Sequence, residues 1–356
     1  MASKIQIHVG NVAVGGGAPV SVQSMTNTDS RDAEATLGQI RSLAAYGCEI
    51  VRVALPDEAA LSQLGGIIAE SPLPVVADVH FHARLAVGAL AAGAAGVRIN
   101  PGNIGSRAKV AEVIKAAQEA AAPIRIGVNS GSLPKEMCQL AERDRSQALV
   151  NTALEYVHMF EDLGFTEFKV SAKSSSVRET IDTNLALAAG ISYPIHLGIT
   201  EAGTIRAGVV KSAVGIGALL AQGVGDTIRV SLTGDPVEEV RAAYEILKSL
   251  GLRQRGPNLI ACPTCGRSEV DVEAIALQVE QRLQEYGSSF EVAVMGCVVN
   301  GPGEARHADF GIACGRGEGL IFAHGKPVKK APAALLVEAL FEEIEKARQS
   351  QRASRP

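Results

Sequence analysis

The sequence contains no tryptophan, and aromatic residues make up only 4% of its 356 residues. So few rings argue against a surface that stacks nucleic-acid bases. Arg and Lys number 34 against 38 Asp and Glu, a formal net charge of −4. This balance argues against general binding of nucleic acid or of an anionic membrane. No apolar run reaches the ~20 residues of a membrane span, and the N-terminus lacks the apolar segment of a secretion signal. We therefore expect a cytoplasmic protein.

Cysteine is also scarce, with six residues. In a reducing compartment such thiols serve more often as free groups or metal ligands than in disulfides. Apolar residues reach 47% of the chain, enough for a large core, and 37 glycines indicate many turns and close backbone approaches. The length fits two domains of ordinary size or one large domain.

A strand-then-helix rhythm runs from residue 20 to about residue 250. Ala- and Leu-rich stretches with helical spacing separate short β-rich runs near 20–25, 49–54, 74–79, 96–99, 124–128, 166–171, 194–199 and 226–231. Repeated units of similar size predict a closed (β/α)8 TIM barrel over residues 1–250. An open, doubly wound sheet is the alternative.

A Gly- and Pro-containing basic linker, 251–260, ends this rhythm. The remainder, 261–356, predicts a smaller α/β domain. Its pattern indicates a helix over 270–286, strands near 290–295, 309–313 and 319–323, and a terminal helix from 332.

Polar side chains gather at the carboxyl ends of the barrel strands. Residues two apart in a strand share a face, and the polar residues on one parity are Arg52, Asp78, His80, Arg98, Asn100, Arg125, Asn129, Lys169, Ser171, Lys173, His196, Thr200, Arg229 and Ser231. On one strand a solvated face or an ion pair explains this pattern equally well. Repetition on many strands, at the catalytic end of a barrel, is hard to explain by packing. Because cations outnumber carboxylates, we expect a small polyanionic ligand such as a diphosphate.

Two further features lie at the same end. Glu201 follows the seventh strand, and its carboxylate suits either a salt bridge at the rim or general acid–base work. His80 and His82 form an H-x-H pair, which binds catalytic metals in some proteins. Since His196 is the one other plausible histidine ligand, we do not expect a metal in the barrel.

Three cysteines stand out in the second domain: Cys262 and Cys265 in CPTCG, and Cys297 in GCVVN. Adjacent Gly and Pro turns let backbone N–H groups approach sulfur, so we expect a metal site. A closed zinc site needs a fourth Cys or His, and an iron–sulfur cluster would leave one iron to a weaker ligand. The candidates for the fourth position are Cys314, His307 and His324 for zinc, and Glu304 for a cluster. Spacing alone does not separate these cases.

Segments along nearly the whole chain carry a resemblance to a known family. The most specific are CPTCGR and MGCVVNGPGEA, and others are PVSVQSMTNTDSRD, VRINPGNIG, IRIGVNSGSL, FKVSAKSS, HLGITEAG and IRVSLTGDP. With these segments the chain resembles the bacterial two-domain 4-hydroxy-3-methylbut-2-enyl diphosphate synthases of the non-mevalonate (MEP) isoprenoid pathway. The resemblance implies an iron–sulfur oxidoreductase. Such an enzyme opens the ring of 2-C-methyl-D-erythritol 2,4-cyclodiphosphate and removes water, which gives (E)-4-hydroxy-3-methylbut-2-enyl diphosphate.

The same resemblance implies residue roles. A [4Fe–4S] cluster would be held by Cys262, Cys265, Cys297 and Glu304, with Glu304 yielding its place to the substrate during catalysis. Glu201 would handle a proton or stabilise the reacting intermediate. The substrate would meet Arg52, His80, Arg98, Asn100, Arg125, Asn129, Lys173, Thr200, Arg229 and Ser231. Cys314 departs from the small residue expected there, and we expect it to be a buried thiol.

Flavodoxin or ferredoxin is the expected donor of two single electrons, because no nucleotide-binding fingerprint is present. We also expect a homodimer. The last barrel helix travels about 22 Å over about 15 residues toward the end of the barrel away from the substrate. A linker of about ten residues spans at most ~35 Å, so a cluster domain that caps the partner's barrel avoids strain.

Two other function classes stay open. One is a zinc-stabilised barrel lyase or transferase that acts on a phosphorylated substrate without redox chemistry. The other is a non-enzymatic iron–sulfur sensor that binds a diphosphate metabolite.

Overall fold

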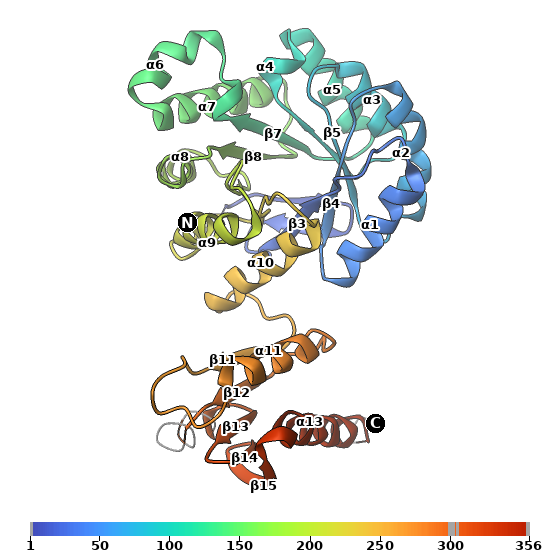
Figure 1. Ribbon diagram of the computed structural model, residues 1–356. Helices are drawn as coiled ribbons and strands as arrows, with labels where there is room; N and C mark the ends of the chain where they lie inside the picture. The colour runs from blue at the N-terminus through green and yellow to red at the C-terminus, as the bar shows by residue number, and fades with distance from the viewer. Residues whose placement is uncertain (1–2, 298–302, 304–305, 354–356) are drawn as a thin grey trace. The chain divides into compact units, whose positions relative to one another are not determined.

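The computed structural model describes residues 3–297, 303 and 306–353. The chain divides into two compact units, Met1–Arg253 and Gln254–Pro356 (Figure 1). The first unit opens with an antiparallel hairpin, β1 (Gln6–Val9) and β2 (Val12–Gly15). Ile7, Val9 and Val14 of the hairpin pack against Ile50 and Val76. These two residues lie near the amino ends of their strands, so the hairpin covers the amino end of the barrel.

Parallel strands form an eight-stranded barrel in the first unit. Its order is β8 (Phe168–Lys173), β7 (Ile124–Asn129), β6 (Gly96–Ile99), β5 (Val75–Asp78), β4 (Ile50–Ala54), β3 (Ser21–Met25), β10 (Thr227–Ile228) and β9 (His196–Leu197). A parallel bridge between Val170 and Ile195, with a 2.9 Å hydrogen bond from Val170 N to Pro194 O, joins β8 to the β9 segment. The predicted TIM barrel is confirmed, and every predicted strand is present.

Helices follow the strands and cover the outside of the barrel (Figure 1). They are α1 (Ala33–Ala45), α2 (Glu58–Glu70), α3 (Ala83–Ala91), α4 (Pro101–Ile104), α5 (Arg107–Glu119), α6 (Cys138–Arg143), α7 (Arg145–Asp162), α8 (Val177–Gly190), α9 (Ile205–Leu220) and α10 (Pro236–Ser249). Side chains such as Asp32, Asp57 and Asp235 accept first-turn N–H groups and fix where helices begin. Outward strand residues such as Val51, Ile126 and Val170 pack with the helices into one apolar core.

The second unit is a five-stranded mixed sheet with helices α11 (Val272–Leu283) and α13 (Leu336–Ala353). Its order is β11 (Asn258–Ala261), β12 (Glu291–Met295), β13 (Phe310–Cys314), β14 (Glu318–Ala323) and β15 (Lys326–Pro332). The first three strands are parallel and the last two pairings are antiparallel. Val279 of α11 and Phe341 of α13 pack into the same core. The predicted helices and central strands are confirmed.

The two edge strands of this sheet are not predicted from the sequence. β15 reads KPVKKAP, and its lysines and prolines are devices that protect an edge rather than typical strand residues. β11 begins at Asn258, inside the predicted linker, so the irregular connection ends at Pro257. No helix among the described residues has the length and apolar character needed to cross a membrane.

Candidate functional site

Polar side chains fill the inside of the barrel, where TIM barrels usually place branched apolar residues. Gln23 Nε2 and Ser21 Oγ donate to Thr227 Oγ1 at 2.7 and 2.8 Å, which links β3 to β10. Lys169 and His196 are buried on β8 and β9. Because these residues share a parity with the polar residues at the strand ends, the predicted alternation of faces holds through the barrel.

Asp78, the last residue of β5, is the anionic centre of the mouth. Its Oδ2 lies 3.3 Å from Arg52 Nε on β4, and its Oδ1 lies 3.2 Å from Arg98 Nη1 on β6. Burial opposes ionisation, but Arg52, His80 and Arg98 outweigh it and hold the pKa of Asp78 well below its usual range. Asp78 is therefore ionised near neutral pH and pairs with two arginines from neighbouring strands.

Glycines give two long cationic side chains room inside the barrel. A Cβ at Gly127 would collide with Arg98 Nε, and a Cβ at Gly198 would lie 2.5 Å from Lys173 Nζ. Arg98 Nη1 also lies 3.0 Å from His80 Nε2, whose side chain is half exposed at the mouth. Any larger residue at either glycine would displace a cation from the site.

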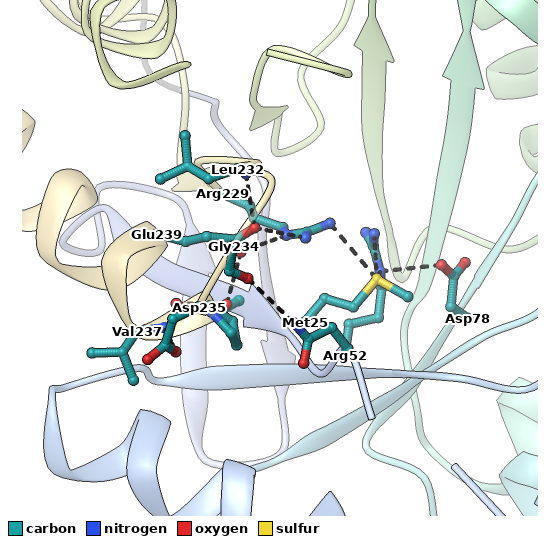
Figure 2. Close-up of polar contacts among 12 residues, drawn as sticks. Met25, Arg52, Asp78, Arg229, Leu232, Gly234, Asp235, Val237 and Glu239 are labelled. Carbon is teal, nitrogen blue, oxygen red and sulfur yellow. Dashed lines mark hydrogen bonds and ion pairs between the residues drawn. The ribbon is translucent and has the colours of Figure 1, made fainter. Parts of the chain in front are cut away.

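Met25 lies between two arginines, Arg52 and Arg229, as Figure 2 shows. Arg52 places Nε and Nη2 at 3.2 and 3.0 Å from Met25 Sδ, and Arg229 Nη1 lies 3.6 Å from the same sulfur. Arg52 also contacts Asp78, so the polar contacts run without a break from Asp78 to Arg229 (Figure 2).

Glu239 on α10 anchors the other side of Arg229. It accepts from Arg229 Nε at 3.1 Å and Nη2 at 3.0 Å. It also accepts from Ser24 Oγ at 2.8 Å and from Leu232 N at 3.0 Å, and its side chain is only 3% exposed. Neither Met25 nor Glu239 is among the residues predicted from the sequence. Met25 lies on the same face of β3 as Ser21 and Gln23, and this alternation is the sequence feature that could have placed it inside the barrel.

Several buried side-chain nitrogen atoms near these arginines have no hydrogen-bond partner among the described residues. Arg125 Nε donates to Ser171 Oγ at 2.9 Å, but Arg125 Nη1, Lys169 Nζ, Arg98 Nε and both ring nitrogens of His196 are unpaired. Burial, with the nearby arginines, lowers the pKa of Lys169 to about 7 and holds the pKa of Arg125 and Lys173 well below their usual values.

The described part of this cluster holds four arginines, two lysines and two carboxylates. The basic residues are Arg52, Arg98, Arg125, Lys169, Lys173 and Arg229, and the carboxylates are Asp78 and Glu239. Buried cations without counter-charges are unfavourable unless an anion joins them. The arrangement therefore suits a small ligand with several negative charges.

The remaining predicted residues lie at the same end of the barrel. Asn100 caps α4 by accepting from Gly102 N at 3.1 Å, and its Nδ2 donates to Ser132 Oγ at 3.0 Å. Ser132 Oγ also donates to the Asn129 carbonyl at 3.3 Å, which ties the loops after β6 and β7 together. Thr200 and Ser231 are half-buried beyond β9 and β10.

Glu201 is exposed and has a φ of 54°, in the left-handed region that few residues other than glycine adopt. Such strained positions cluster at functional sites, where the surrounding structure holds them in place. The turn presents the Glu201 carboxylate to solvent, and its role in the reaction stays a prediction.

The three cysteines follow two neighbouring parallel strands of the second unit. Cys262 follows β11 directly and Cys297 follows β12 by two residues, and the pairing of Ala261 with Val294 brings these strand ends to one edge of the sheet. Gly296 N donates to Cys262 Sγ at 3.2 Å. Hydrogen bonds from the backbone N–H groups of Arg267 and Ser268 lower the pKa of the Cys265 thiol.

This donor set fits an iron–sulfur cofactor, because thiolates that accept backbone N–H bonds are the usual cluster ligands. Within the described ranges, no three His, Cys, Asp or Glu side chains are placed to hold a metal ion. Glu304, the predicted fourth ligand, lies outside the described residues, so the complete ligand set is not seen.

The two histidine candidates for a zinc site are less well placed than the cysteines. His324 follows β14, whose last residue pairs with Phe310 at the amino end of β13, so His324 lies at the edge opposite the cysteines. His307 also precedes β13 on that side. Cys314 ends β13 near Cys262 and is fully buried, and burial raises its pKa to about 11. The predicted buried thiol at Cys314 is confirmed.

Comparison with known proteins identifies relatives of both units. Residues 4–244 match the model of the GcpE TIM-barrel domain, and residues 258–346 match that of the GcpE protein C-terminal domain. A Geobacter sulfurreducens protein named 4-hydroxy-3-methylbut-2-en-1-yl diphosphate synthase (flavodoxin) is 58% identical over 341 residues, which cover 96% of this chain and 97% of that protein. A protein of the same name from Clostridium acetobutylicum is 54% identical over 340 residues, with 96% and 97% coverage.

A solved structure of another enzyme shares the barrel fold. A dihydropteroate synthase of Yersinia pestis in complex with a sulfonamide drug superposes with a TM-score of 0.52 at 12% identity, over 70% of this chain and 100% of that chain. At this identity the likeness establishes the fold and nothing about the ligand.

Proposed function

The chain belongs to the GcpE family, and from this membership we infer that it carries out the reaction of its relatives. It reduces 2-C-methyl-D-erythritol 2,4-cyclodiphosphate, with ring opening and loss of water, to (E)-4-hydroxy-3-methylbut-2-enyl diphosphate in the MEP pathway. Flavodoxin is the electron donor named for the relatives. The structural observation that supports this function is the barrel mouth, where four arginines and two lysines outnumber two carboxylates and suit a polyanionic ligand.

We propose that the cationic residues bind the diphosphate of this substrate. Arg52, Arg98, Arg125, Lys173 and Arg229 supply charge and N–H donors that match phosphate oxygens. The residues that complete the binding site are His80, Asn100, Asn129, Thr200 and Ser231. The bound phosphates would pair with buried N–H donors that have no partner among the described residues, such as Arg125 Nη1.

We propose Glu201 as the proton-handling residue. Release of a hydroxyl group as water needs a proton, and a carboxyl group at the rim of the mouth can supply or relay one. Its exposed position on a strained turn beside Thr200 supports this role.

The cofactor is of the iron–sulfur type, and we propose a [4Fe–4S] cluster held by Cys262, Cys265, Cys297 and Glu304. When bound, it would supply the single electrons and the exposed iron site that the reduction requires. The placement of Cys262 and Cys297 after adjacent parallel strands supports the three-thiolate part of this set.

We propose that residues 1–250 bind the substrate, 251–260 link the domains and 261–356 carry the cluster. We also propose a homodimer in which each cluster domain caps the partner's barrel. The early start of β11 shortens the irregular connection to residues 251–257, and this supports capping in trans. A reducing compartment such as the cytoplasm keeps ligand thiols available, and we propose that location.

Anaerobic turnover of the cyclic diphosphate with reduced flavodoxin, followed by identification of the product, tests the proposed function. We expect the open-chain enyl diphosphate, with two electrons consumed per molecule. Binding without turnover would favour a metabolite sensor, and conversion that does not depend on a reductant would favour a lyase or transferase.

A further inference from the structure

Two guanidinium groups at the mouth of the barrel share one uncharged acceptor. Met25 Sδ lies 3.0 and 3.2 Å from two nitrogens of Arg52 and 3.6 Å from Arg229 Nη1 (Figure 2). Each arginine has a carboxylate elsewhere: Asp78 lies 3.3 Å from Arg52, and Glu239 lies 3.0 Å from Arg229. The order of contacts is therefore carboxylate, guanidinium, thioether, guanidinium, carboxylate.

A thioether in the central position has a specific consequence. Thioether sulfur is a weak hydrogen-bond acceptor and carries no charge, so it orients both guanidinium groups without neutralising either. Burial lowers the pKa of Arg52 to about 10, and the positive charge of Arg229 adds to this effect. The two cations therefore repel each other, and a carboxylate between them would remove the positive field that attracts an anion.

Both arginines retain donors for a ligand. A guanidinium group has five N–H donors. Arg229 uses one each from Nε, Nη2 and Nη1 in the contacts above, which leaves two. The side chains of Arg52 and Arg229 are 11% and 16% exposed, so they reach the open end of the barrel.

We propose that Met25 is a positioning residue. Its uncharged sulfur holds the guanidinium groups of Arg52 and Arg229 at a fixed spacing, and the two groups form a clamp that binds one phosphate group. This proposal rests on the proposed function, since it assigns the clamp to the diphosphate of that substrate. The competing explanation is that Met25 only fills space, as methionine often does in irregular gaps.

Three substitutions separate the two explanations. Met25→Leu keeps the volume and removes the acceptor, Met25→Gln keeps an uncharged acceptor at a similar reach, and Met25→Glu places a carboxylate between the arginines. Met159→Leu is the control, because Met159 packs, half-buried, against the apolar core away from these arginines. Each holoenzyme is titrated with inorganic diphosphate by calorimetry, and kcat and KM are measured with the cyclic diphosphate.

If Met25 spaces the two arginines, the Met25→Gln variant binds inorganic diphosphate about as tightly as wild type. The Met25→Leu variant binds about tenfold more weakly, because the contact that orients the guanidinium groups is lost. The Met25→Glu variant binds about 100-fold more weakly, because the added carboxylate removes the positive field. KM rises in the same order while kcat changes less, and Met159→Leu has no effect. If Leu binds as tightly as wild type and Gln binds more weakly, Met25 is a space filler and the proposal is wrong.

The Leu and Gln variants carry the test even if the Glu variant does not fold. The outcome also separates this proposal from the function on which it rests. If wild type binds inorganic diphosphate with the predicted order among variants but does not convert the cyclic substrate, the clamp stands and the proposed function fails.

Discussion

Removal of the Glu239 carboxylate should destabilise the barrel mouth, although this residue lies on a helix and is not predicted from the sequence. Its carboxylate accepts four hydrogen bonds, two of them from Arg229, in an almost fully buried position. Glu239→Gln keeps the shape and an acceptor for Leu232 N, but it leaves the Arg229 guanidinium without its counter-charge. Breaking a buried ion pair from one side costs about 3–5 kcal/mol. Because the amide retains part of the network, we expect about 3 kcal/mol.

Urea denaturation of the holoenzyme measures this loss through the midpoint and slope of the transition, and KM for the cyclic diphosphate should rise because Arg229 is no longer held. The matched control is Glu238→Gln. Glu238 is the preceding residue of the same helix, and it pairs with Arg241 at 2.7 Å where both side chains are about one-third exposed. Exposed pairs contribute about 0.2–1 kcal/mol. If the two variants lose the same stability, the carboxylate of Glu239 does not organise the site.

Three other substitutions test the packing around Arg98, the charge of Lys169 and the role of Glu201. Gly127→Ala should displace Arg98 and raise KM about tenfold or more, whereas Gly65→Ala, which meets no atom within 4 Å, should leave KM unchanged. The pKa of Lys169 is lowered from 10.5 to about 7 by burial, so the unfolded chain binds more protons between those values and stability rises with pH there. Lys169→Met should flatten this rise in urea titrations and stabilise the fold by about 3 kcal/mol at pH 8; an unchanged slope would contradict it. Glu201→Gln should lower kcat far more than it weakens substrate binding, and unchanged turnover would remove Glu201 from the reaction.

The barrel could be predicted because its signal is local and repeated. Apolar residues face the helices on one parity and polar residues face inward on the other, so Arg52, Arg98 and Arg125 could be placed together from the strand pattern alone. The register confirms that arrangement, since Arg98 and Arg125 are paired neighbours on β6 and β7.

What could not be predicted depends on contacts between distant segments. Glu239 resembles an ordinary acidic residue in the first turn of a helix, and only the docking of α10 beside Arg229 and Ser24 gives it a function. Met25 has the composition of a core residue, and its role follows from two arginines that are far away in sequence. The edge strand β15 was missed because its lysines suit an exposed edge and not an average strand.

We propose that three cysteines of the second unit hold an iron–sulfur cofactor, which reduces a polyanionic substrate bound at the barrel mouth. The most direct test is the iron and acid-labile sulfide content of protein purified without oxygen, together with its visible spectrum. We expect a brown protein with equal amounts of iron and sulfide, and loss of both in Cys265→Ser. A colourless protein that contains zinc and no sulfide would contradict the claim.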